Sequence, residues 1–86
     1  MSSDEYTVLR LRVVADADPG ALARVLERFQ NLNVLPRKVH ADLSTNGVFH
    51  VEIDITGIPT HMMDIVAGKI AESPCIHSAR WHPLVI

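Results

Sequence analysis

The stretch from residue 34 to residue 56 constrains the fold most, because two alternating segments flank a short turn there. VLPRKVHADLS and VFHVEIDIT are joined by Thr45-Asn46-Gly47, and Asn-Gly between alternating segments is typical of a β-hairpin. Setting Ser44 opposite Val48 gives one wholly apolar face, with the pairs Leu43–Phe49, Ala41–Val51 and Val39–Ile53. Gly47 then falls where a left-handed residue is needed.

The other face of this hairpin brings opposite charges together. The same register sets Asp42 against His50, His40 against Glu52 and Lys38 against Asp54, and such cross-strand pairs contribute roughly 0.2–1 kcal/mol each. A shift by one residue would mix the two faces. Imidazole is a common metal ligand, but the acidic residues opposite the two histidines favour an exposed polar ladder, and no metal or cofactor site is expected.

Two segments precede the hairpin. Residues 6–14 alternate, with Leu9, Leu11 and Val13 on one side and Arg10 and Arg12 on the other, as in a half-buried strand. A helical stripe then runs to about residue 32 and is formed by Leu22, Val25, Leu26, Phe29 and Leu32. Asp18 is placed to act as its N-cap, Pro19 suits the first turn, and Asn33 suits a left-handed helix end.

Two further segments follow the hairpin. Residues 60–73 place Met63, Val66, Ala67 and Ile70 on one helical face. Residues 75–82 predict a last strand whose facing stays open, because Ile76, Ala79 and Trp81 do not share one parity. The order is strand, helix, strand, strand, helix, strand. It predicts an α+β, ferredoxin-like βαββαβ sandwich, in which a four-stranded antiparallel sheet has two helices on one face.

The length and composition limit the classes of function. Eighty-six residues form one small domain, over residues 6–86 after a disordered 1–5, and a domain of this size favours oligomerisation. A net charge of −2 gives no basic field for nucleic acid or membrane. The polar start shows no signal peptide, and Cys75 is the only cysteine. A reduced, cytoplasmic setting is therefore expected, with Cys75 as an apolar filler.

We expect no catalytic site, because the polar side chains that the sequence places close together are the cross-strand pairs of the hairpin. The register already explains these pairs. The remaining candidate is the turn that starts the first helix, at Asp18-Pro19-Gly20. Unpaired N–H groups and partial positive charge at a helix start can hold a carboxylate, and a glycine there lets a ligand approach the backbone. The alternative is a tight turn in which Gly20 serves conformation only.

DPGALARVLERFQNLNV, the hairpin and the closing IHSARW resemble an ACT domain over nearly the whole chain. Within that family the chain looks most like the short-form regulatory (small) subunit of acetolactate synthase, with GALARVLERF as the nearest piece. The resemblance implies a non-catalytic subunit of branched-chain amino acid biosynthesis that binds an amino-acid effector, assembles with a thiamine-diphosphate-dependent synthase, or does both. A free-standing dimeric sensor of an amino acid or other small ligand is the alternative.

The resemblance also implies where an effector binds. The expected positions are the first turn and the helix end, namely Asp18, Pro19, Gly20, Ala21, Leu22, Asn33 and Leu35. Valine-responsive subunits carry a glycine and, two residues later, an asparagine at the helix end, where this chain has Asn33 and Leu35. The second strand lies at a sheet edge in this topology, and its free N–H and C=O groups predict a symmetric homodimer.

Overall fold

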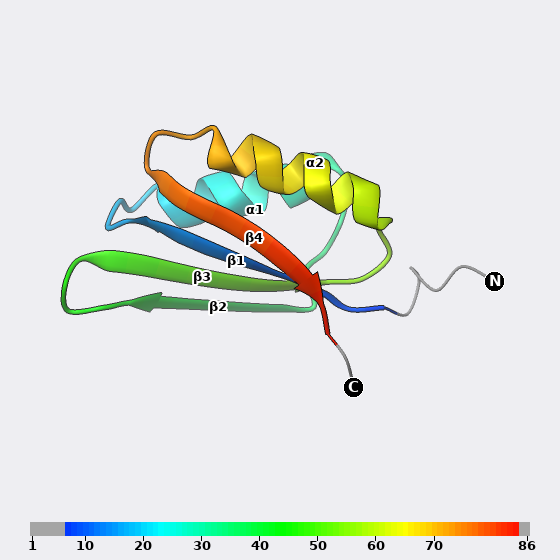
Figure 1. Cartoon of the computed structure of the whole chain (residues 1–86), viewed down its shortest axis with the longest axis horizontal. Helices are drawn as coiled ribbons and strands as arrows, with labels where there is room; N and C mark the ends of the chain where they lie inside the picture. Colours follow the sequence, from blue (N-terminus) through cyan, green and yellow to red (C-terminus); the bar gives the residue numbers. More distant parts are fainter. Residues whose placement is uncertain (1–6, 85–86) are drawn as a thin grey trace.

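A computed structural model describes residues 7–84, so the expected disorder of residues 1–5 lies outside the described part of the chain. Its elements follow the predicted order: β1 (Leu9–Asp16), α1 (Ala21–Asn31), β2 (Lys38–Leu43), β3 (Val48–Ile55), α2 (Thr60–Ala71) and β4 (Ile76–Pro83), as Figure 1 shows. β2 begins later than expected, two residues after Pro36, because proline lacks the N–H that a strand ladder uses.

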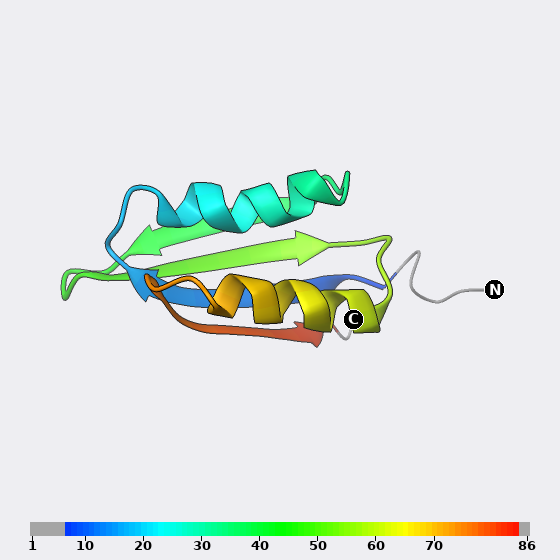
Figure 2. The same cartoon turned by 90° about the horizontal axis from the view of Figure 1, so that it is seen from above.

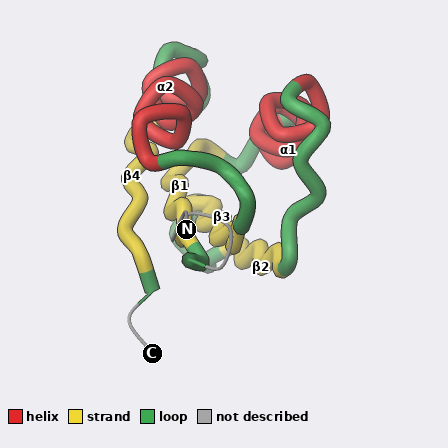
Figure 3. The backbone as a smooth tube through the Cα atoms, turned by 90° about the vertical axis from the view of Figure 1, so that its right-hand side faces the viewer, coloured by secondary structure: helices red, strands yellow, loops and turns green. Residues whose placement is uncertain are grey.

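The four strands form one antiparallel sheet in the order β2-β3-β1-β4. Seen from above, α1 lies toward the β2 side of the sheet and α2 toward the β4 side (Figure 2). Both helices cover the same face, and the end-on view leaves the opposite face open (Figure 3). The predicted ferredoxin-like βαββαβ fold is therefore confirmed.

The core fills the space between the helices and the sheet. β1 alternates between buried and more exposed side chains, with Leu9, Leu11, Val13 and Ala15 facing the helices. From α2, the buried residues are the four predicted ones, Met63, Val66, Ala67 and Ile70. Helix α1 contributes Ala21, Val25 and Phe29. Strands β1 and β3 lie at the centre of the sheet, and β2 and β4 lie at its edges.

The register predicted for the β2–β3 hairpin is confirmed at every pair, from Lys38 opposite Asp54 to Leu43 opposite Phe49. Gly47 has φ +82°, the left-handed conformation expected of it. The turn closes through the Gly47 N–H, which donates to the Ser44 carbonyl at 3.1 Å. Alternation and turn chemistry together thus determine this part of the sheet.

The apolar side of β2 faces the helices but is not covered by them. Every residue of β2 is exposed, including Val39 at 43% and Leu43 at 59% of their full surface. This differs from the burial that an inner sheet face suggests. The core is formed by both helices and by the inward side chains of β1, β3 and β4, and no residue of the edge strand β2 belongs to it.

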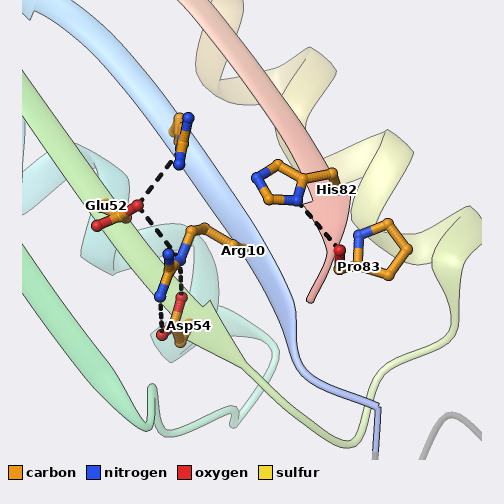
Figure 4. Close-up of polar contacts among 6 residues, drawn as sticks. Arg10, Glu52, Asp54, His82 and Pro83 are labelled. Atoms are coloured by element: carbon orange, nitrogen blue, oxygen red, sulfur yellow. Dashed lines mark hydrogen bonds and ion pairs between the residues drawn. The ribbon is translucent and has the colours of Figure 1, made fainter. Parts of the chain in front are cut away.

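The charges on the open face pair differently from the prediction, and Figure 4 shows the arrangement. Asp54 accepts two hydrogen bonds from the Arg10 guanidinium, at 2.8 and 3.0 Å, instead of pairing with Lys38. Glu52 Oε1 lies 3.2 Å from Arg10 Nε and 3.3 Å from Arg12 Nε, so its partners are arginines and not His40. Each acidic residue of β3 has two neighbouring strands, and β1 offers it the planar, multidentate guanidinium.

The Arg10–Asp54 contact also changes the acidity of the carboxyl. The hydrogen bonds from Arg10 hold the pKa of Asp54 below its usual range, more strongly than burial raises it. The pKa of Arg10 is raised by the same hydrogen bonds. Asp54 is only 7% exposed, so the pair is a structural element of the open face.

The facing of β4, left open by the sequence, is set by a β-bulge. Ala79 lies opposite Val13 and Trp81 opposite Leu11, whereas the pairing shifts so that Ile76 lies opposite Ala15. The extra residue between Ile76 and Ala79 corrects the parity. All three side chains therefore face the helices, and Trp81 Nε1 donates a hydrogen bond of 2.7 Å to Asp64 on α2.

Candidate functional site

The turn between β1 and α1 is a short hydrogen-bonded loop built by Asp18. The Gly20 N–H donates to Asp18 Oδ1 at 2.8 Å, and the Ala21 N–H donates to the Asp18 carbonyl at 2.9 Å. The helix begins at Ala21 with Gly20 as its N-cap, so the prediction that Asp18 is the N-cap was wrong by two residues. The i→i+3 bond closes a separate turn before the first helical bond, from Arg24 N–H to Gly20 O, can form.

Gly20 is not required by the backbone. Its φ of −81° and ψ of −11° are helical values that any L-residue adopts. A Cβ added there would meet its nearest neighbour, Asp18 Oδ1, at 3.4 Å, an ordinary contact. The explanation that Gly20 serves the conformation of a tight turn is therefore wrong, and the approach of another molecule remains a reason for a glycine.

The donors left at this turn differ from those expected. Asp18 already accepts hydrogen bonds from the N–H groups of Gly20 and Ala21. Within residues 7–84, no acceptor bonds the N–H groups of Leu22 and Ala23, which belong to the first helical turn, where intrahelical partners are lacking. Ala23, which the sequence did not single out, therefore joins Leu22 as a candidate carboxylate donor. Ala21 has its side chain fully buried in the core.

A groove of about 240 Å³ runs beside this turn on the side of β2. Its walls are Ala17, Asp18, Pro19, Leu22, Leu43 and Phe49. Five of the six are apolar side chains of the turn, α1 and the hairpin, and Asp18 supplies the charge. Three of the predicted first-turn positions, Asp18, Pro19 and Leu22, thus line one groove, whereas Gly20 does not line it and Ala21 is buried in the core.

The helix end carries the other two predicted positions. Asn33 has φ +57°, as predicted, and the Val34 N–H donates to the Phe29 carbonyl at 2.9 Å. A second groove, of about 370 Å³, is lined there by Leu26, Gln30, Asn33, Val34, Leu35 and Pro36. Leu35 is 88% exposed, so its side chain is free to contact another molecule.

One chain does not bring these two halves of the predicted site together. They lie at opposite ends of α1, whose eleven residues span roughly 16 Å at the usual helical rise. The side of the molecule between them is the exposed edge strand β2 with Val39 and Leu43. Asn33 and Leu35 can therefore share a site with the first turn only through a second molecule.

Metal-binding and membrane-spanning features are not found in the part of the chain that the structure describes. Residues 7–84 contain no group of three or more His, Cys, Asp or Glu side chains arranged to hold a metal ion. Over the same residues, no helix has the length and apolar character needed to cross a membrane.

Comparison with known proteins finds solved structures that share this fold. The C-terminal domain of the MgtC protein from Mycobacterium tuberculosis superposes with a TM-score of 0.76 at 10% identity, over 98% of this chain and 94% of that one. The ACT domain from GTP pyrophosphokinase of Chlorobium tepidum gives 0.73 at 12% identity, over 87% and 96%. A formyltetrahydrofolate deformylase from Pseudomonas syringae gives 0.75 at 16% identity, over 90% of this chain and 27% of the enzyme.

At these identities the structural likeness shows the fold alone. No curated protein matches the sequence significantly. The sequence profile of the ACT-like domain, in contrast, matches residues 2–85. Since that profile spans nearly the whole chain and a solved ACT domain has the same fold, the protein belongs to the ACT-like domain family.

Proposed function

We propose that this chain is a regulatory or accessory subunit that binds an amino-acid effector and assembles with a catalytic chain, and carries out no chemistry of its own. The ACT fold is a regulatory ligand-binding fold shared by many proteins, which supports the regulatory role. The resemblance to short-form small subunits of acetolactate synthase points to a thiamine-diphosphate-dependent synthase as the partner, in the cytoplasm.

The observation that carries this proposal is the unconstrained glycine at the first turn. Gly20 has an ordinary helical φ, and a Cβ there would make only an ordinary 3.4 Å contact with Asp18 Oδ1, so its smallness is useful to an approaching ligand and not to the turn. The free N–H groups of Leu22 and Ala23 lie in the first turn of α1. They can donate to a carboxylate at the positive end of the helix. The groove of about 240 Å³ beside them offers apolar walls for a small side chain.

A symmetric dimer through β2 completes this site. β2 starts near the helix-end groove, at Lys38, and ends beside the first-turn groove, at Leu43. Antiparallel pairing of two β2 strands about a twofold axis reverses one relative to the other. The first turn of one protomer then approaches Asn33 and Leu35 of its partner, and the exposed Val39 and Leu43 become covered.

The second candidate is a free-standing homodimeric sensor. It is favoured by the same geometry, because two copies of this chain supply every predicted site position and no third component is needed. The two candidates differ in whether a synthase binds.

Co-purification tests the partner directly. The tagged chain, expressed with the synthase catalytic chain from the same genome, should retain that chain on an affinity column and change its activity. The Gly20→Ala variant should still retain the synthase but respond less to L-valine. A dimer that binds amino acid yet retains no synthase and leaves its activity unchanged would establish the free-standing sensor and reject the subunit.

A further inference from the structure

A third groove touches the first turn on the side of α2 and β4. It measures about 690 Å³, within the range of small-molecule sites, and is larger than either groove at the ends of α1. It lies between α1, the end of α2 and the start of β4, so one chain forms it completely. Asp18 lines both this groove and the smaller one on the β2 side.

Three cations line this groove. Arg24 and Arg28 stand one helical turn apart on α1, and Lys69 lies in the last turn of α2. Arg24 Nη1 donates to Cys75 Sγ at 3.1 Å and lies 3.7 Å from Asp18 Oδ2, which leaves other guanidinium donors free. Within residues 7–84, no carboxylate lies within ion-pair distance of Arg28 or Lys69.

Carboxylates line the same groove, together with an apolar floor. The acidic residues are Asp16, Asp18, Glu27 and Glu72, and the buried aliphatic residues beneath are Val25, Ile70 and Ile76. The carboxylates would repel a polyanion and the arginines would repel a polycation, so neither kind of ligand matches this rim. A small molecule with both charges and an aliphatic part matches all three features.

We propose that this groove binds a free α-amino acid with a short aliphatic side chain. Arg24 and Arg28 hold its carboxylate, the acidic residues of the rim attract its ammonium group, and the aliphatic floor receives its side chain. The site goes beyond the proposed function, because it is complete in one protomer and requires neither the dimer nor the first-turn donors.

Calorimetry with three matched compounds tests the ligand chemistry on the full chain. L-leucine carries both charges, 3-methylbutylamine lacks the carboxylate, and 4-methylpentanoate lacks the ammonium. L-leucine should bind, and each truncated compound should bind at least about tenfold more weakly, since each loses hydrogen bonds to charged groups. Absence of saturable L-leucine binding, or equal binding of the three compounds, would overturn the proposal.

Variants then locate the bound L-leucine. Arg28→Gln, a change at a side chain with no ion-pair partner among the described residues, should weaken binding by about tenfold. Arg12→Gln on the exposed open face is the matched control and should leave binding unchanged. Because Cys75 is the only cysteine and lies in this groove, bound L-leucine should also slow its alkylation.

The dimer proposal fails independently of this one. Leu43→Glu, which disrupts the proposed β2 interface, should leave L-leucine binding in the groove intact. If L-leucine binding is lost in Gly20→Ala or Leu43→Glu but unchanged in Arg28→Gln, the ligand occupies the first-turn site and the groove proposal is wrong.

Discussion

Gly20 has a backbone conformation open to any L-residue, so replacing it tests binding separately from folding. Gly20→Ala should raise the free energy of unfolding by about 0.4–1 kcal/mol, because alanine restricts the unfolded chain. The new methyl group narrows the approach to the first turn, and L-valine should shift the Leu22 and Ala23 amide resonances less than in the wild type. Gly20→Asp should abolish that shift while leaving the fold largely intact, since its carboxylate occupies the ligand's place.

Gly68 on α2 supplies the matched control. A Cβ at Gly68 would meet nothing within 4 Å, and Gly68→Ala should stabilise the helix by about 0.5–1 kcal/mol. It should leave the L-valine shifts unchanged. If both variants stabilise the fold and neither alters the shifts, Gly20 has no role in binding at the first turn.

Asp54 makes the stability of the fold depend on pH. Its folded-state pKa is lowered by the hydrogen bonds from Arg10. The carboxylate therefore stabilises the fold fully above its unfolded pKa of about 4, and this contribution is lost as the pH falls through the lower folded-state value. Urea unfolding from pH 7 to pH 2 should show Asp54→Asn less stable than the wild type at neutral pH, with the gap narrowing below about pH 4.

Asp42→Asn is the control for removing a carboxylate from the same face of the sheet. Asp42 lies on β2 opposite His50, and its replacement should leave the neutral-pH urea midpoint close to that of the wild type. A gap between wild type and Asp54→Asn that stays constant down to pH 2 would contradict the assigned role of the Arg10 hydrogen bonds.

At the scale of elements, helix α1 is followed by Asn33, a residue in the left-handed conformation two positions beyond the last helical residue. The Asn33 N–H donates to the Gln30 carbonyl and the Val34 N–H to the Phe29 carbonyl, both at 2.9 Å, the paired bonds of a Schellman motif. Asn33→Gly should raise the free energy of unfolding by about 0.5 kcal/mol, because glycine adopts a positive φ without a steric cost. Thermal or urea unfolding measures this change.

The same substitution two residues earlier should act in the opposite direction. Asn31 is the last residue of the helix, where glycine is a poorer helix former than asparagine by roughly 0.3 kcal/mol. Asn31→Gly should therefore destabilise the fold slightly. Equal signs for the two variants would show that the positive φ at residue 33 does not limit stability.

Structural features that depend only on residues close together in the chain could be predicted from the sequence. The hairpin register and the left-handed Asn33 follow from alternation and local turn chemistry, and both are confirmed. The bulge in β4 needed the pairing with β1, because a break in parity between Ile76 and Ala79 does not say which residue turns away. The Arg10–Asp54 pair likewise depends on which strand lies next to β3.

The candidate site was predictable in its position and less so in its contacts. Asp18, Pro19 and Leu22 of the first turn line one groove, but Asp18 itself accepts hydrogen bonds from two of the expected donors, the N–H groups of Gly20 and Ala21. That competition depends on the side-chain geometry of a three-residue turn, which composition and periodicity do not specify. The separation of Asn33 and Leu35 from the turn follows from the length of α1.

At the scale of the whole molecule, the uncovered edge strand predicts a dimer. Leu43 is 59% exposed on β2, and Leu43→Glu should convert the protein to a monomer in light scattering at high micromolar concentration. The charge would be buried without a partner in the dimer but stays solvated in the monomer. The fold should persist, because an exposed side chain contributes little to the core.

Ile65→Glu is the matched control for this prediction. Ile65 is 52% exposed on α2, away from β2, and the same charge there should leave the dimer intact. Wild-type protein that scatters light as a monomer at high micromolar concentration would contradict the prediction.

The bulge in β4 also determines where this strand can change in length. Removing one residue, His77 or Ser78, would restore strict alternation and keep Ile76, Ala79 and Trp81 facing the helices. Removing a residue from the regular part of the strand, such as Arg80, would turn a core side chain toward solvent. Single-residue deletions in β4 are therefore tolerated at the bulge and nowhere between Ala79 and Trp81.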